Sequence, residues 1–393
     1  MLWKIIALAV AGLMSGAAFA QTNVTVYGAA DVTFDNVKST GATTASQNMP
    51  SRNRVSGNSS LLGFKGTEDL GGGLKAVFQF EGGVANDAAG AFNFNRDTFV
   101  GLSGGFGTVA AGILTGPTRG LGAAMDPFVG ATGITSNTGL IGKMGGAGTS
   151  IFDTRWDNAV AYISPSMSGL TVTAAYVANE NKSRDGATAA FAPAAGAATC
   201  VSVGQNPLNV VCSIPNSNAA QLNTRGYDIG ARYANGPILA GLTYNKVSVG
   251  DTTGIEGSDL RAAFRYDFGM GTVGLMLDRV KWSDNVGSEK RNAWFIPVTF
   301  NVTGNGKIVA QYGKAGDISG TSNTGAKQFA VGYEHSLSKR TTLKAVWSQI
   351  SNEADANYDF GLNPVNAASA SNVFGGRLGA DPKGFQVGVR HSF

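Results

Sequence analysis

Apolar and polar side chains alternate along most of this chain after its first twenty residues. Residues 259–268 are an example, since Leu, Ala, Phe, Tyr and Phe occupy the even positions and four charged side chains occupy odd ones. Successive side chains of a β-strand point to opposite faces, so this period predicts a strand with one apolar and one charged face. In a helix the same charges would be spread around the circumference.

Sixteen segments share this period and are predicted to be strands. They are residues 24–37, 59–69, 74–83, 93–102, 107–114, 157–164, 170–179, 224–234, 238–249, 258–267, 271–282, 290–302, 306–313, 326–337, 341–351 and 383–393. Pro297 is out of place in the twelfth segment, because proline cannot donate a ladder hydrogen bond. The sequence offers no reason for its presence there.

The connections between these segments alternate in length. Short turns lie at 71–73, 103–106, 165–169, 235–237, 268–270, 303–305 and 338–340, and longer loops lie between them at 38–58, 84–92, 115–156, 180–223, 250–257, 283–289, 314–325 and 352–382. Such alternation puts every tight turn at one end of an up-and-down antiparallel sheet. Outer-membrane barrels have this plan, with an even strand count and short periplasmic turns, and sixteen strands enclose an aqueous lumen.

The predicted fold is therefore all-β, a 16-stranded antiparallel transmembrane β-barrel. A soluble β-sandwich is the alternative, but it seldom reaches so many regularly alternating hairpin strands. The mean hydropathy of +0.01, with 43% hydrophobic and 14% charged residues, fits a chain with one lipid face and one water face. A helical membrane protein would need spans of about 20 apolar residues, and none follows the first twenty positions.

The first twenty residues are interpreted separately. Lys4, the apolar run 5–14 and the sequence Ala18-Phe19-Ala20 form a secretory signal peptide. The predicted organisation is therefore a signal peptide at 1–20 and a barrel domain at 21–393. Export places Cys200 and Cys212 where a disulfide can form, and we predict one. A formal net charge of only +4 argues against a nucleic-acid partner.

Two matches to known sequence motifs of enzymes do not indicate a catalytic or nucleotide-binding site. Residues 101–105 fit G-x-S-x-G and residues 269–274 fit G-x-G-x-x-G, but a further strand follows each instead of the helix that these sites require. The chain has only two histidines, and no His/Cys spacing typical of zinc is present. We therefore predict no catalytic, cofactor-binding or metal-binding residues and no enzymatic activity.

Several segments resemble the Gram-negative general porins. Residues 24–31 are similar to the first strand of that family, 63–76 to its second hairpin, 96–102 with 106–108 to its fourth and fifth strands, and 387–393 to its terminus. The resemblance implies a homotrimer in the lipid of the outer membrane, where it passes small ions and hydrophilic solutes. It also implies that the third loop folds into the lumen as a constriction, and that Phe393 is read as an assembly signal.

Residues 115–156 suit the role of that third loop. Of residues 115–154, ten are glycine and only Arg119, Asp126, Lys143 and Asp153 are charged, and a loop that bends inside a tube needs a permissive backbone. An external loop is the alternative. The family resemblance assigns Arg96 and Arg155 to the constriction wall, and Asp126, Lys143 and Arg119 are the candidates on the loop.

The chain departs from the family pattern in ways that bear on ion selectivity. Many relatives carry arginine where Leu61 stands, and Arg-Gln where Ile113 and Leu114 stand; Arg52 and Arg54 in the first loop are candidates to compensate. Because charges at a constriction set selectivity, we predict a passive diffusion porin with weak anion preference. The alternatives are a substrate-specific channel with saturable solute binding and a barrel enzyme, which two remote histidines disfavour.

Overall fold

A computed structural model describes residues 23–90, 92–146, 150–178, 200–202, 210–212, 224–249, 255–284, 287–365 and 377–393. Its strands are β1 Asn23–Thr40, β2 Met49–Gly57, β3 Leu61–Gly71, β4 Leu74–Gly83, β5 Thr98–Gly104, β6 Gly107–Thr115, β7 Arg155–Ile163, β8 Leu170–Val177, β9 Cys200–Ser202, β10 Val210–Cys212, β11 Thr224–Asn235, β12 Ile238–Val249, β13 Ile255–Asp267, β14 Gly271–Ser283, β15 Ser288–Asn301, β16 Gly306–Ala315, β17 Ala326–Ser336, β18 Thr341–Asn352 and β19 Asp381–Ser392. The signal peptide predicted at 1–20 lies outside the described residues.

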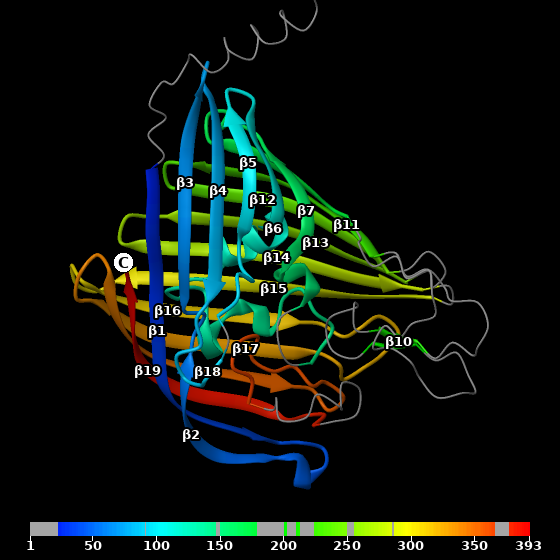
Figure 1. Ribbon diagram of the computed structural model, residues 1–393. Helices are drawn as coiled ribbons and strands as arrows, with labels where there is room; N and C mark the ends of the chain where they lie inside the picture. Colours follow the sequence, from blue (N-terminus) through cyan, green and yellow to red (C-terminus); the bar gives the residue numbers. More distant parts are fainter. Residues whose placement is uncertain are drawn as a thin grey trace, which may run out of the picture.

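The strands pair antiparallel in chain order around a closed barrel, except that β9 and β10 form a separate two-stranded sheet and β8 pairs with β11 (Figure 1). The barrel closes where Ala29–Thr40 of β1 pair with Ser392–Asp381 of β19. Strands β2 and β3 lie end to end along β1, because β3 pairs with its residues 23–29 and β2 with its residues 32–39. The 17 hydrogen-bonded strands of the main sheet therefore form 16 barrel strands, and the predicted fold is confirmed.

The period of two along each strand separates an outer from an inner face, as the sequence predicted. In β13, Leu260 and Phe264 are 42% and 48% exposed, whereas Arg261 and Ala263 between them are 0% and 7% exposed. The exposed row is apolar and faces outward, where lipid covers it. No helix among the described residues is long and apolar enough to cross a membrane.

Pro297 has a structural reason that the sequence did not provide. Its side chain is buried on the inner face of β15, and the ladder between β14 and β15 is interrupted at this point, between Val298 and Phe295. The facing residue is Gly274, where an added Cβ would lie 2.8 Å from Cε of Met125 and 3.1 Å from Cγ of Pro297. The missing side chain of Gly274 makes room for Met125 of the third loop, and proline is tolerated at position 297 because the ladder is interrupted there.

The strand boundaries differ from the sequence prediction most clearly in the first long loop and at the start of β5. Residues 49–57 form β2 although the sequence placed 38–58 in a loop, because a strand beyond the apolar band needs no lipid-facing row and therefore shows no alternation. Strand β5 begins at Thr98 instead of 93. Asp97 turns away from the ladder because its carboxylate accepts hydrogen bonds from the backbone N–H and hydroxyl of Thr115.

The third loop folds into the barrel, as predicted. It contains the helix α2 Pro117–Met125 and the 3-10 turns η2 Gly133–Thr135, η3 Asn137–Gly139 and η4 Ile151–Asp153. Figure 1 shows this segment inside the ring of strands. Leu121, Met125 and Ile141 of the loop form one buried cluster with inward side chains of β12 to β15, namely Leu239, Ala263, Met276 and Phe295.

Candidate functional site

The start of the third loop is fixed by an aspartate of the barrel wall. Asp228 of β11 accepts hydrogen bonds from the backbone N–H of Thr118 at 3.1 Å and from its hydroxyl at 2.6 Å. A carboxylate in this position satisfies an N–H of the first helical turn that has no partner within the helix. Gly116 is required beside it, because an added Cβ would lie 2.2 Å from Asp228 Oδ2.

A buried ion-pair network ties the far end of the loop to the same wall. Arg261 of β13 is fully buried and donates to Asp153 Oδ1 at 2.8 Å and to Asp259 Oδ2 at 2.7 Å. It also donates to the carbonyl oxygen of Thr118 at 3.1 Å. Asp278 of β14 accepts the backbone N–H of Gly142 at 2.8 Å. The loop is therefore held to β13 and β14 by charged groups that water does not reach.

A second group of charges lies on the part of the barrel formed by β4 to β7. Glu81 accepts hydrogen bonds from Arg96 and from the hydroxyl of Tyr27. Arg155, the first residue of β7, lies 2.9 Å from Asp97 and 3.8 Å from Glu81. The side chains of Arg96 and Arg155 keep 20% and 15% of their surface exposed. They are thus paired but not sealed from the lumen.

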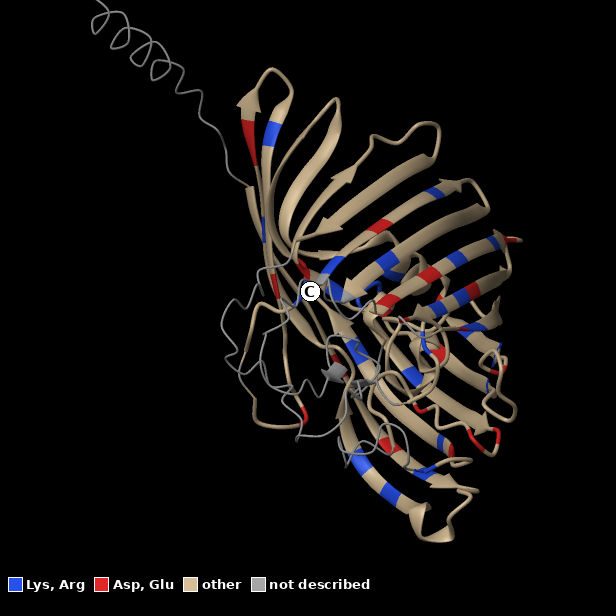
Figure 2. Cartoon of the chain, turned by 90° about the vertical axis from the view of Figure 1, so that its right-hand side faces the viewer, with Lys and Arg blue, Asp and Glu red and all other residues tan. Residues whose placement is uncertain are grey.

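Arg119 of the third loop lies close enough to this group for the charges of Arg155, Arg96 and Asp97 to act on it. Its guanidinium donates to the carbonyl oxygen of Asp153. Burial, followed by the nearby charge of Arg155, lowers the pKa of Arg119 to about 10, so it stays protonated at neutral pH. The constriction charges, as we name Arg96, Arg119, Arg155, Glu81 and Asp97, comprise three cations and two anions. Figure 2 shows that basic and acidic positions are interspersed along the strands of the barrel.

The structure places Asp126 and Lys143 away from this group. The carboxylate of Asp126 accepts the backbone N–H groups of Phe128 and Asn137 at 3.1 and 3.0 Å. The ammonium of Lys143 donates to the carbonyl oxygens of Gly146 and Asp359. Both residues are buried, and burial moves the pKa of each to about 7, upward for Asp126 and downward for Lys143. Their contacts are those of groups that shape the loop.

The described first part of the eighth long loop, up to Val365, also enters the lumen, which the sequence did not indicate. Tyr358, Phe360 and Val365 are buried in one cluster with Ile134 and Leu140 of the third loop. The segment spans from the third loop, where Gly146 donates to Asn357 Oδ1 at 2.8 Å, to the strand β2. The alternation of apolar and polar residues carries no information about a segment that lacks a regular period.

Arg52 and Arg54 hold the other side of this eighth loop. Arg52 donates to the carbonyl oxygen of Val365 at 2.7 Å, and Arg54 donates to that of Pro364 at 3.0 Å. Arg54 also pairs with Asp35 at 3.0 Å. Because these guanidinium groups contact the eighth loop and Asp35 and not the group on β4 to β7, we do not count them among the constriction charges.

The two remaining predicted sites lie elsewhere on the chain. The short hairpin of β9 and β10 places Cys212 directly opposite Cys200 in the backbone register. The side chains of both cysteines are not among the described parts of the structure.

The backbone of Phe393 exchanges two 3.0 Å hydrogen bonds with Gly28. Its ring lies where a side chain on Gly28 would stand, and it is 50% exposed.

Sequence reasoning did not identify Glu81, Asp97, Asp153 or Arg261 as functional. The inward position of Arg261 was readable from the alternation in β13, but its partner Asp153 lies 108 residues away. Glu81 and Asp97 were readable only as charges near strand ends. The sequence carried no signal that these acids meet the predicted arginines.

Comparison of the sequence with known proteins finds one matching family and several relatives. A family model described as Gram-negative porin matches residues 7–355. The chain is 31% identical to outer membrane porin protein 32 of Delftia acidovorans, over 99% of each chain. It is 27% identical to an outer membrane porin protein of Bordetella pertussis, over 89% of this chain and 94% of the relative.

Solved structures show the same architecture. The anion-selective porin from Comamonas acidovorans superposes with a TM-score of 0.70 at 27% identity, and the match covers 95% of this chain and 100% of that one. The outer-membrane protein OmpT of Vibrio cholerae superposes with a TM-score of 0.61 over 95% and 98% of the two chains. At 13% identity the latter likeness concerns the fold alone.

Proposed function

The chain belongs to the Gram-negative porins, and from this premise we propose that the constriction charges give its channel a weak preference for anions. The protein lies in the outer membrane and forms a water-filled channel for passive diffusion of ions and small hydrophilic solutes. Its family and fold are those of a channel. We propose no catalytic role and no cofactor.

The weak anion preference is inferred from the balance of positive and negative charges at the constriction. Arg96 and Arg155 pair with Glu81 and Asp97, and the nearby Arg119 adds a third positive group against these two negative ones. A ring of fixed charges favours counter-ions in a pore, and the pairing of two arginines with carboxylates weakens the field. The relative from Comamonas acidovorans is named an anion-selective porin, which supports the same sign here.

The purified protein in a planar bilayer is expected to give a reversal potential of anion sign under a KCl gradient. The value is expected to stay well short of the limit for a purely anion-conducting pore, because the excess is one charge. A reversal potential of cation sign would contradict the proposal. Liposome swelling with sugars of graded size tests the alternative, a substrate-specific channel, for which uptake is stereospecific and saturable instead of showing a smooth size cutoff.

We extend the proposal to the assembly of the protein. The working unit is a homotrimer, residues 1–20 are a cleaved signal peptide, residues 21–393 are the barrel domain, and Phe393 is an assembly signal. The family supports the trimer, and so does Ala30, a small residue on the outward face of β1. Small residues allow a neighbouring barrel to approach closely.

We also propose a disulfide between Cys200 and Cys212. The register of β9 and β10 pairs them directly, and opposed residues of an antiparallel pair lie about 4.5–5.5 Å apart at Cα, within the range that a disulfide needs. Alkylation of denatured, unreduced protein is expected to modify neither thiol, and prior reduction is expected to expose two. Two alkylated cysteines without reduction would reject the crosslink.

A further inference from the structure

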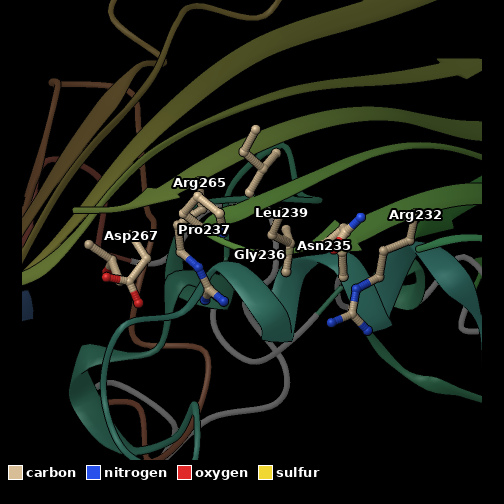
Figure 3. A pocket seen from close by; sticks show the side chains of 10 residues that line it. Arg232, Asn235, Gly236, Pro237, Leu239, Arg265 and Asp267 are labelled. Carbon is tan, nitrogen blue, oxygen red and sulfur yellow. The ribbon is translucent and has the colours of Figure 1, made fainter. Parts of the chain in front are cut away.

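A cavity of about 270 Å³ lies where β11, β12 and β13 reach their short connections. Its lining includes Arg232, Arg265, Asp267 and the turn Asn235-Gly236-Pro237. Figure 3 shows that the side chains of Arg232 and Arg265 project from the same side of the sheet, with the turn between them. Short connections of outer-membrane barrels are on the periplasmic side, so the cavity belongs to the periplasmic mouth.

Both arginines face the lumen. Asp228 and Gly230 of β11 contact the start of the third loop, and the period of two puts Arg232 on the same face. Arg265 follows Arg261 and Ala263 on the inner face of β13 and donates to the carbonyl oxygen of Ala124 at 2.6 Å. Their direct partners in the intervening strand β12 are Gly241 and Leu239. Two strand spacings, about 10 Å, separate their backbones across the wall, and two residues, about 7 Å, separate them along it.

These two arginines differ from several other inward cations, which pair with carboxylates. Arg261 pairs with Asp153 at 2.8 Å, Lys344 with Asp31 at 2.7 Å and Lys307 with Glu334 at 3.0 Å. Within the described part of the chain, neither Arg232 nor Arg265 has a carboxylate oxygen within 4 Å. The charges of those three cations are neutralised by carboxylates, whereas this corner keeps its positive charge.

The donors in the cavity are free for a ligand. A guanidinium carries five N–H donors, and Arg265 spends one on the carbonyl oxygen of Ala124. Asp267 lines the cavity, but its Oδ1 accepts the backbone N–H of Gly269 at 2.8 Å and so serves the turn. Two cations against one carboxylate leave one positive charge in excess, beside a space large enough for a small solute.

We propose that Arg232 and Arg265 form a binding step for small oxyanions, solutes with a carboxylate or phosphate group, at the periplasmic mouth. Planar guanidinium groups match such oxygens with paired hydrogen bonds. Binding in a channel must be weak enough for release, and the open position of Arg232, which is exposed, meets that requirement. The proposal rests on the anion preference proposed above and adds a second place where the channel selects its solutes.

The test is block of the chloride current by inorganic phosphate, added to each bilayer chamber in turn, with succinate as the carboxylate probe in a second series. The wild-type channel is expected to be blocked at a lower concentration from one chamber than from the other. The double variant Arg232→Gln with Arg265→Gln is expected to need at least about tenfold more anion, because tenfold corresponds to the loss of only one charge-assisted hydrogen bond. It is also expected to lose the difference between the two sides.

A control variant removes the same charge from the outer face. Arg279→Gln with Lys281→Gln changes two outward side chains of β14, and its block is expected to equal that of the wild type. An unchanged blocking concentration in the Arg232 and Arg265 variant overturns the binding step. The single variant Arg232→Gln, at an exposed position, keeps the test open if the double variant does not assemble. Cation preference of the wild type in KCl alone would instead refute the premise, and the two failures are therefore distinguishable.

Discussion

Replacing Arg261 by methionine is expected to destabilise the folded barrel by about 3–5 kcal/mol, the usual consequence of removing one partner from a buried ion pair. Arg261 is fully buried and bridges Asp153 of the third loop to Asp259 of the wall. Without it, two carboxylates remain in a space that water does not reach. The third loop then loses its main attachment to β13, so its path through the lumen changes as well.

The destabilisation is measured by urea unfolding of the purified protein in detergent, and the loop displacement by single-channel conductance and its noise. Arg279→Met is the matched control, because Arg279 is exposed and bonds only Asn292 at 2.8 Å among the described residues. Surface substitutions of this kind usually change stability by about 0.5 kcal/mol or less. Equal losses of stability in the two variants would show that the buried contacts of Arg261 contribute no more than those of a surface arginine.

The double substitution Arg96→Gln with Arg155→Gln is expected to reverse the sign of the ion preference. Among the constriction charges, three cations and two anions become one cation, Arg119, and two anions, Glu81 and Asp97. The excess charge therefore changes from +1 to −1, and a pore favours the ions of sign opposite to its fixed charge. The reversal potential under a KCl gradient is expected to move from the anion to the cation side.

The same number of charges removed from the outside provides the control. Lys314→Gln with Lys327→Gln alters outward positions of β16 and β17, and the reversal potential is expected to stay at the wild-type value. Adding Glu81→Gln to the pore variant is expected to shift it back toward anions. The difference is expected to shrink at 1 M salt, where the Debye length is about 3 Å. A pore variant that keeps the wild-type potential would place the selecting charges elsewhere.

The strands and their faces were accessible to sequence reasoning because a period of two is a local property. The alternation in residues 259–268 identified both the lipid row and the lumen row of β13, and the short turns indicated the order of the barrel. The same reasoning missed β2, whose residues have no lipid row to reveal them. It also left Pro297 without explanation, because its facing residue, Gly274, becomes visible only once the register of β14 and β15 is known.

The family resemblance placed Arg96 and Arg155, and the structure supplied their neighbours. Glu81 lies 15 residues before Arg96, and Asp97 lies 58 residues before Arg155. Nothing in the sequence separates these acids from the other charged residues near strand ends. Whether a lumen arginine contributes its charge to the pore depends on the distance to such a partner. Sequence reasoning therefore indicated a sign for the ion preference but not the balance of charges behind it.

By itself, then, the sequence determined the number of barrel strands, the side of the wall on which each side chain lies, and the length of the loop that narrows the lumen. The tertiary structure alone decided which charges meet. Asp126 and Lys143 look like loop charges in the sequence, yet the folded loop buries both against backbone groups. In the sequence, Arg232 and Arg265 cannot be told apart from other inward charged residues such as Arg261. Among the described residues, however, no carboxylate pairs with them. The physical reason is that strand periodicity follows from bonds between adjacent residues, whereas burial and ion pairing follow from the path of loops that bring distant residues together.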